Sequence, residues 1–314
     1  MHNIWRHTAP ANIALIKYMG KTDASSNIPT NSSLSYTLNN YLTTVELELA
    51  EHDQWQPWNE QNPFNIALTE TAQQRFIKHL QFIKKQLNCP AHFIIRSTNN
   101  FPANCGIASS ASSFAALTKA AVQAICELKQ IPLLSIEQQA RLSQQGSGSS
   151  CRSFYSPWCL WQGDNVKPVD LAYKELDHAV ILVNAGTKAV SSSSAHQRVT
   201  TSLLFSNRVE RAEQRLTILL DMLSQSHWKD AFQIVWEEFW DMHALFETAR
   251  PSFGYMTADS MKVLQYVRDC WQQYKDGPLT TLDAGPNVHL LFRPDQQSLK
   301  TALLQYLQEH YHVI

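Results

Sequence analysis

Period-two alternation early in the chain and helical spacing later in it predict a fold of mixed α and β structure. Val45, Leu47 and Leu49 alternate with Glu46 and Glu48, which is typical of a half-buried strand. After residue 105, apolar side chains recur at intervals of three or four, which is typical of one face of a helix. The 314 residues exceed the usual size of one domain, so we expect one large domain or two closely packed ones.

The predicted elements follow one another in a definite order. Short apolar runs at 93–95 and 180–183 predict buried strands. Helical stripes are predicted at Phe114, Leu117, Ala121, Ile125 and Leu128, at Val209, Leu216, Leu219 and Leu223, and at Phe232, Val235, Trp236 and Phe239. The strand that ends at Asn184 precedes the largely helical half, so we expect domains at 1–184 and 185–314.

Composition and charge give no sign of nucleic-acid or membrane binding. Hydrophobic residues make up 44% of the chain, charged ones 17%, and the formal net charge is -1. No run approaches the roughly 18 apolar residues of a membrane span, and the first residues lack the apolar centre of a signal peptide. We therefore expect a cytoplasmic protein with no membrane partner.

The cysteines show no paired spacing. The chain has six, none of them in a CxxC pair, and a chain of this length folds without disulfides. We interpret as reduced thiols Cys89, Cys105, Cys126, Cys151, Cys159 and Cys270.

The segment 99–112, NNFPANCGIASSAS, predicts an anion site. A turn rich in small residues leads into a helix, where free backbone N–H groups and the positive end of the helix dipole favour phosphate. Ser109 and Ser110 add hydroxyl donors. Ordinary serine capping is the alternative, and neither GxxxxGK[ST] nor GxGxxG is present.

A second turn of small residues, GSGSSCR at 146–152, follows a helix with a Ser135–Gln138 capping box. Arg152 can bind two oxygens at once, so the turn suits a carboxylate or a phosphate ligand. A flexible surface loop is the alternative.

Two further positions carry candidate chemistry. Lys17 ends an apolar run, which suits either a snorkelling side chain or, with Tyr18 and Lys21, a phosphate clamp. Asp283 stands before Gly-Pro at a strand-turn junction, where either turn formation or catalysis explains it.

Taken together, these segments resemble the diphosphomevalonate decarboxylases of the GHMP kinase superfamily. The resemblance rests on six segments in the family's order: APANIALIKYMGK (9–21), IPTNSSLSYTL (28–38), NNFPANCGIASSAS (99–112), GSGSSCRS (146–153), VSSSSAHQ (190–197) and LDAGPN (282–287). It implies a two-domain α+β fold with a left-handed βαβ unit in the N-terminal domain and a helix-rich C-terminal domain. It also implies a homodimer.

The implied reaction is the ATP-dependent decarboxylation of 5-diphosphomevalonate to isopentenyl diphosphate, through phosphorylation of the C3 hydroxyl. ATP and Mg2+ are the implied cofactors, with the metal bridging the phosphates and no protein ligand assigned to it. Three alternatives stay open: a kinase that does not decarboxylate, a decarboxylase of a monophosphate substrate, and a non-catalytic binding protein.

The resemblance also assigns residues to roles. The catalytic group is Asp283, which faces the hydroxyl, Lys17 beside it, and Arg152 and Asn12 on the carboxylate that leaves as CO2. The substrate group is Tyr18, Met19, Gly20, Lys21, Arg75, Ser147, Gly148, Ser149, Ser150, Cys151 and Ser193. The ATP group is Ala103, Asn104, Cys105, Gly106, Ile107, Ala108, Ser109, Ser110, Lys188 and Ser192.

Some positions depart from the family's pattern. Met19 stands where tryptophan is common, Asn104-Cys105 replaces a pair of alanines, and His196 replaces a methionine. None removes a charged catalytic group, but all bear on the shape of the substrate and ATP pockets.

Overall fold

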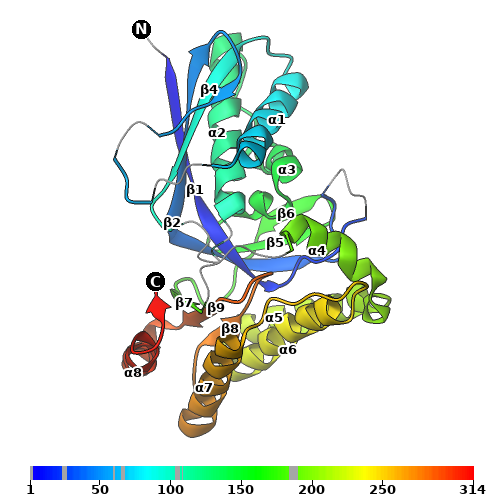
Figure 1. Ribbon diagram of the computed structural model, residues 1–314, viewed down its shortest axis with the longest axis vertical. Helices are drawn as coiled ribbons and strands as arrows, with labels where there is room; N and C mark the ends of the chain where they lie inside the picture. Colours follow the sequence, from blue (N-terminus) through cyan, green and yellow to red (C-terminus); the bar gives the residue numbers. More distant parts are fainter. Residues whose placement is uncertain are drawn as a thin grey trace.

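The computed structural model describes residues 3–22, 27–58, 61–64, 68–102, 107, 109–183 and 190–314. Within them the chain forms two sheets with helices packed on them, and the expected α+β class is confirmed (Figure 1). None of the helices in these ranges combines the length and apolar character needed to cross a membrane.

The first sheet is built around two long strands, β1 (Ile4–Ile16) and β2 (Ser33–Ala50), which pair antiparallel along most of their length. The other edge of β2 pairs with β4 (His92–Asn99) near its end and with β5 (Trp158–Gln162) near its start. The short strands β3 (Gln54–Trp55) and β6 (Asn165–Pro168) extend the sheet beyond β4 and β5. The sheet therefore runs in the order β3-β4-β2-β5-β6, with β1 beside β2.

Helices cover one face of this sheet. They are α1 (Glu70–Gln86), α2 (Ser109–Lys129) and α3 (Ile136–Gly146), and α2 packs directly on β1 and β2. The predicted capping box at the start of α3 is present, with Ser135 accepting from the Gln138 N–H and Gln138 accepting from the Ser135 N–H. A 3-10 helix, η1 (Gly148–Phe154), follows α3 at once and carries Arg152.

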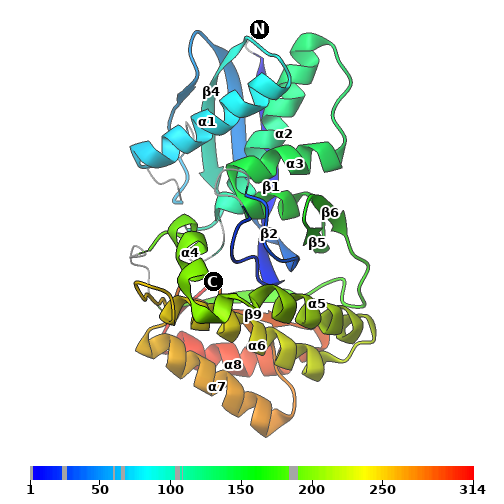
Figure 2. The ribbon, with the colours of Figure 1, turned by 90° about the vertical axis from the view of Figure 1, so that its right-hand side faces the viewer.

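The second sheet runs in the order β10-β7-β9-β8 and lies with the C-terminal helices. Its strands are β7 (Asp177–Leu182), β8 (Leu279–Thr281), β9 (Val288–Phe292) and β10 (His312–Val313). The helices are α4 (Ser192–Arg198), α5 (Arg208–Ser224), α6 (Trp228–Glu247), α7 (Ala258–Tyr274) and α8 (Gln297–Gln308). Figure 2 shows α4 between the helices of the first sheet and those of the second.

One buried apolar cluster joins the two halves. The ends of β1 and β2 that lie nearest the second sheet, with Ile13, Ile16 and Leu34, belong to the same cluster as Leu219 of α5 and Phe239 of α6. A separate cluster fills the space between the first sheet and helices α1 and α2. The halves are therefore held together by shared core.

Three apolar residues that the periodicity placed inside are exposed, which corrects the prediction at Leu49, Leu128 and Val209. Leu49 and Leu128 lie in the last turn or last residues of their elements, beyond the packed layer. At the start of α5 the buried position next to Val209 is taken by Arg208, which is 0% exposed. Glu46, expected on the solvent side, is buried because Arg6 and Arg96 pair with it.

The five cysteines that fall within the described ranges are free and buried, as expected for reduced thiols. Cys105 lies outside those ranges.

Candidate active site

A cavity of about 450 Å³ collects most of the predicted residues. Its walls come from the end of β1, the start of α2, the junction of α3 with η1, the start of α4, and the turn between β8 and β9. The predicted residues that line it are Lys17, Tyr18, Met19, Lys21, Arg75, Ile107, Ser109, Ser110, Ser147, Gly148, Ser149, Arg152, Ser192, Ser193 and Asp283. Segments up to 266 positions apart therefore meet at one site.

Lys17 and Asp283 form an ion pair in the wall of this cavity. The Lys17 Nζ donates to Asp283 Oδ1 at 2.7 Å, and the lysine side chain is 2% exposed while the aspartate side chain is 29% exposed. Burial raises the pKa of the Asp283 carboxyl, but Lys17 and His289 oppose it more strongly and hold the pKa below its usual range. Asp283 is therefore ionised at neutral pH and reachable from the cavity.

His243 of α6 holds the backbone of Asp283 from behind. Its Nε2 lies 3.2 Å from the carbonyl oxygen of Asp283, and since that oxygen only accepts, the ring proton sits on Nε2. Burial lowers the pKa of His243 to about 3. A neutral ring therefore fixes the turn without adding a charge beside the ion pair.

Hydrogen bonds to buried side chains hold the guanidinium of Arg152, and this positively charged group lines the cavity. Its Nε donates to Asn12 Oδ1 at 3.1 Å and its Nη1 donates to Ser33 Oγ at 2.9 Å. Asn12 is in turn fixed, because its amide donates to the Ser149 carbonyl and the Ser153 hydroxyl. Asn12 therefore orients the guanidinium from behind the cavity wall.

The cavity carries an excess of positive charge. Besides Lys17 it is lined by Lys21, Arg75 and Arg152, and within the described ranges none of these three is paired with a carboxylate. Asp283 is the one carboxylate among the described lining residues. A buried arginine without a counter-charge favours an anionic ligand, because a bound carboxylate or phosphate supplies the missing partner.

Two helix starts point their hydroxyls at one another across the cavity. Helix α2 begins at Ser109, and η1 begins at Gly148, directly after Ser147. The Ser147 hydroxyl donates to Ser110 Oγ at 3.4 Å. Since the first N–H groups of a helix have no partner within the helix, this wall offers several donors to phosphate oxygens.

Some predicted site residues lie behind the lining. Ser150 and Cys151 are fully buried, and their side chains donate to the carbonyls of Ser147 and Gly148. Gly20 has a φ of +99°, which suits glycine, and its N–H donates to His196 Nδ1 at 3.0 Å. Together with Asn12, Ser150, Cys151 and Gly20 support the cavity wall from behind, and none of them lines the cavity. Ala103–Gly106, Ala108 and Lys188 lie outside the described residues.

Comparisons with known proteins decide the family. Residues 9–170 match the family profile described as diphosphomevalonate decarboxylase-like N-terminal domain, and residues 178–313 match the mevalonate 5-diphosphate decarboxylase C-terminal domain. The chain belongs to the diphosphomevalonate decarboxylase family. The diphosphomevalonate decarboxylase of Candida albicans is 31% identical over 95% of this chain and 86% of its own length.

Solved structures of this family have the same fold. A mevalonate diphosphate decarboxylase from Legionella pneumophila has 48% sequence identity and a TM-score of 0.93, covering 99% of this chain and all of that one. A relative solved in complex with MVAPP, AMPPCP and magnesium has 27% identity and a TM-score of 0.88, covering 100% of this chain and 96% of that one.

The cavity also has a lining residue, His196, that was predicted only as a departure from the family's pattern. It stacks on Tyr18 with ring centroids 4.3 Å apart. Because the Gly20 N–H can only donate, Nδ1 is the acceptor and the ring proton is on Nε2. Asn27 and Met242 also line the cavity, and neither lies in a segment whose composition suggested a ligand.

Proposed function

We propose that this chain catalyses the ATP-dependent decarboxylation of (R)-5-diphosphomevalonate to isopentenyl diphosphate, ADP, phosphate and CO2, as a step of the mevalonate pathway of isoprenoid synthesis. Family membership supports this reaction. The observation that carries it at the level of residues is the Lys17–Asp283 ion pair, which faces a cavity that is also lined by Arg152, an arginine with no carboxylate partner among the described residues.

Asp283 orients the C3 hydroxyl and accepts its proton late in phosphoryl transfer. A carboxylate is a poor base for a tertiary alcohol, so early removal of the proton contributes little. The proton transfers as the new O–P bond forms, when the oxygen becomes acidic. Lys17 keeps Asp283 ionised beforehand and offsets negative charge during the transfer.

Arg152 holds the carboxylate that leaves as CO2. Its Nε and Nη1 are engaged by Asn12 and Ser33, which fixes the plane of the guanidinium and leaves its remaining donors for the substrate. After phosphorylation, the C–C bond to the carboxylate breaks, its electron pair forms the C=C bond, and phosphate leaves from C3. The arginine supports this step by fixing the carboxylate in line.

The two sets of phosphates occupy different walls. The substrate's diphosphate lies against Tyr18, Lys21, Arg75 and the start of η1 at Ser147–Ser149. ATP phosphates lie along 103–110, where Ser109 and Ser110 open α2, with Lys188 and Ser192 as further contacts. Met19 and Ser193 complete the lining on the substrate side, and Gly20, Ser150 and Cys151 support it from behind.

The residues present fit Mg2+ held chiefly through phosphate oxygens. Within the described ranges no group of three or more His, Cys, Asp and Glu side chains could hold a metal. Asp283 is the one carboxylate among the described residues that line the cavity. This agrees with the usual coordination of Mg2+ in phosphate-binding enzymes, where one or two carboxylates and the substrate phosphates bind the ion. Mg2+ bound there would neutralise charge on the β and γ phosphate oxygens.

We also propose finer features, which family membership supports. The parallel pair β3–β4, joined through α1, is our candidate for the left-handed βαβ unit. We further propose a homodimer, a cytoplasmic location, and a domain boundary between residues 184 and 185, which lie outside the described residues. Light scattering on the purified protein tests the dimer, which has about twice the chain mass of 35.8 kDa.

An assay with ATP, Mg2+ and 5-diphosphomevalonate tests the reaction directly. ADP, phosphate and CO2 are expected in equal amounts, and EDTA abolishes all three until Mg2+ is added back. ADP without CO2 would indicate a kinase, faster turnover of the monophosphate would indicate a different decarboxylase, and no ATP consumption would indicate a binding protein.

A further inference from the structure

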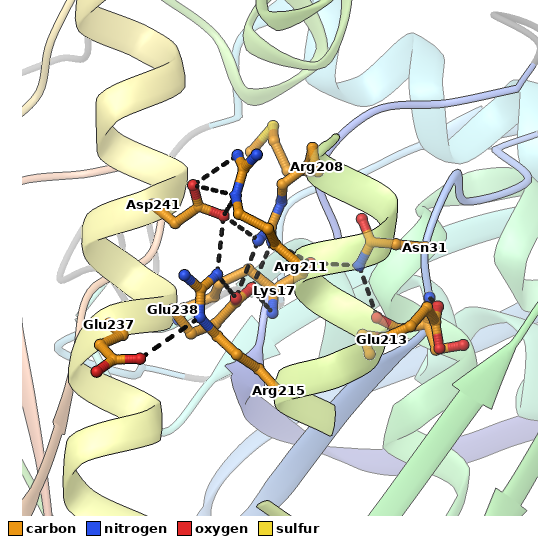
Figure 3. Close-up of polar contacts among 12 residues, drawn as sticks. Lys17, Asn31, Arg208, Arg211, Glu213, Arg215, Glu237, Glu238 and Asp241 are labelled. Carbon is orange, nitrogen blue, oxygen red and sulfur yellow. Dashed lines mark hydrogen bonds and ion pairs between the residues drawn. The ribbon is translucent and has the colours of Figure 1, made fainter. Parts of the chain in front are cut away.

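The backbone of Lys17 is held by two side chains of the C-terminal half and by Asn31 (Figure 3). The pairing of β1 with β2 ends at Ile16, so the strand ladder no longer fixes the next residue. The Lys17 N–H donates to Glu238 Oε1 at 2.9 Å. The Lys17 carbonyl accepts from Arg208 Nη2 at 3.2 Å and from Asn31 Nδ2 at 2.9 Å. Both backbone polar groups of the lysine are therefore held by side chains.

Arg208 and Glu238 are themselves a fully buried ion pair. Both side chains are 0% exposed, and Arg208 also bonds Asp241 at 2.8 Å. Arg215 pairs with the same two carboxylates from the solvent side, and Arg211 pairs with Asp241. Buried ion pairs often stabilise a fold no better than apolar residues of equal volume. Stability alone therefore does not account for this pair.

We propose that the Arg208–Glu238 pair positions Lys17 for the reaction, by holding the lysine backbone so that its ammonium meets Asp283. The inference rests on the proposed function and extends it to α5 and α6, which carry the pair. Glu238 and Arg208 are positioning residues, since they act through Lys17 and do not line the cavity.

Glu238 also acts on the charge of Lys17. Burial lowers the pKa of the lysine, Asp283 and Glu238 raise it, and Arg152 lowers it. The charged and titratable groups that face Lys17 are Asp283, Glu238, Arg152, Arg208 and His243. Removing the Glu238 charge therefore lowers the pKa of Lys17 further, and the lysine loses its proton at a lower pH.

The test compares Glu238→Gln with Asp241→Asn, which removes one carboxylate from the same network but does not touch Lys17. Glu238→Gln should lower kcat by roughly 10- to 100-fold, with little change in the KM for ATP, because a small misplacement near the reacting atoms has effects of this size. The alkaline limb of its kcat profile should move to lower pH. Asp241→Asn should lower the melting temperature while kcat and the alkaline limb stay close to wild type.

A readout that does not depend on activity separates this inference from the proposed function. NMR of protein labelled at lysine reports the pKa of Lys17, assigned by the signal that Lys17→Arg removes. A lower Lys17 pKa in Glu238→Gln but not in Asp241→Asn supports the positioning role, whatever reaction the protein catalyses. A wild-type protein that decarboxylates nothing would overturn the proposed reaction and leave the positioning role standing.

Glu238→Asp keeps the charge and shortens the reach, so it should lower kcat without moving the alkaline limb. An unchanged kcat and an unchanged Lys17 pKa in the Glu238 variants would overturn the proposal. A loss of kcat in Asp241→Asn equal to that in Glu238→Gln would also overturn it. So would the failure of both Glu238 variants to fold while Asp241→Asn folds, because either result would show that the pair has only a structural role.

Discussion

Asp283 combines two properties that a catalytic carboxylate needs: it is ionised through Lys17, and it is open to the cavity. Replacing it with asparagine keeps the shape and removes the acceptor of the hydroxyl proton. We expect Asp283→Asn to lower kcat by about 10²- to 10⁴-fold. Binding of ATP and of substrate, measured by calorimetry, should stay within a few-fold of wild type. A parallel loss of binding and turnover would show that Asp283 acts mainly in holding ligands.

Arg152 differs from Asp283 because it acts on the substrate from binding onward. We expect Arg152→Gln to raise the KM for the substrate by about 10- to 100-fold, since charge-assisted hydrogen bonds contribute about 1.5–3 kcal/mol each. It should also lower kcat, because the carboxylate is no longer held in line. Arg141→Gln is the control, as that exposed arginine pairs with Glu137, one helical turn away, and does not line the cavity. Steady-state kinetics of the two variants decide the matter.

Buried histidines make stability depend on pH, and His79 and His243 are two of them. Burial lowers the pKa of His79 and of His243 to about 3, against about 6.5 in the unfolded chain. Below pH 6.5 the unfolded state therefore binds more protons, so stability falls as the pH falls. Between pH 7.5 and pH 5 the loss should be about 2 kcal/mol for each histidine.

Urea unfolding at the two pH values measures this effect. His79→Gln can still donate to the Thr118 hydroxyl, which the His79 Nε2 contacts at 2.9 Å, but it cannot take up a proton. The variant should have a shallower acid dependence than the wild type. The same acid dependence in both proteins would assign the effect to other groups.

At the scale of elements, the packing of α1, α2 and α3 closes on Gly146, the last residue of α3. A Cβ atom there would lie 2.3 Å from Phe114 Cδ1 and 2.8 Å from the His79 ring. We expect Gly146→Ala to lower the free energy of unfolding by about 1–3 kcal/mol, the usual effect of overpacking a core. Since Gly146 also lines the cavity, substrate affinity should fall as well.

Gly163→Asn is the matched control for this substitution. Gly163 lies in the turn between β5 and β6 with a φ of +54°, and a Cβ there meets nothing within 4 Å. Asparagine tolerates this backbone conformation, so the free energy of unfolding should change by no more than a few tenths of a kcal/mol. A similar loss in both variants would mean that crowding at Gly146 is not the cause.

At the scale of the whole molecule, the buried cluster that contains Ile13, Leu34, Leu219 and Phe239 belongs to both sheets. If one half unfolded, the other would lose the part of its core that lies in this shared cluster, so we expect a single cooperative transition. Calorimetry should give equal calorimetric and van't Hoff enthalpies. Two resolved transitions, or a fragment 1–184 that folds alone, would show that the halves are independent.

Much of the fold was within reach of the sequence. The period-two run at Val45 and Leu47, the apolar run at 93–95 and the stripe at Leu216, Leu219 and Leu223 predicted elements that the structure contains. The predicted burial was wrong at Leu49, Leu128 and Val209, because the periodicity shows only that a residue is apolar. It does not register where the packed layer ends, or that an arginine takes an inside position.

The features of the site also fall into two groups, those that the sequence predicts and those that depend on the tertiary structure. The sequence by itself determined the chemical groups and their local settings: the serines at the start of α2, the turn of small residues that carries Arg152, and Asp283 between two strands. These follow from short-range rules of capping, turns and charge. The pairing of Lys17 with Asp283 was implied by the family resemblance, and the structure contains it. What only the tertiary structure decided was the support of Arg152 by Asn12 and the hydrogen bonds of Arg208 and Glu238 to the lysine backbone. Such contacts join positions 140 to 266 residues apart, and the burial of charge that makes them selective exists only once the two sheets share a core.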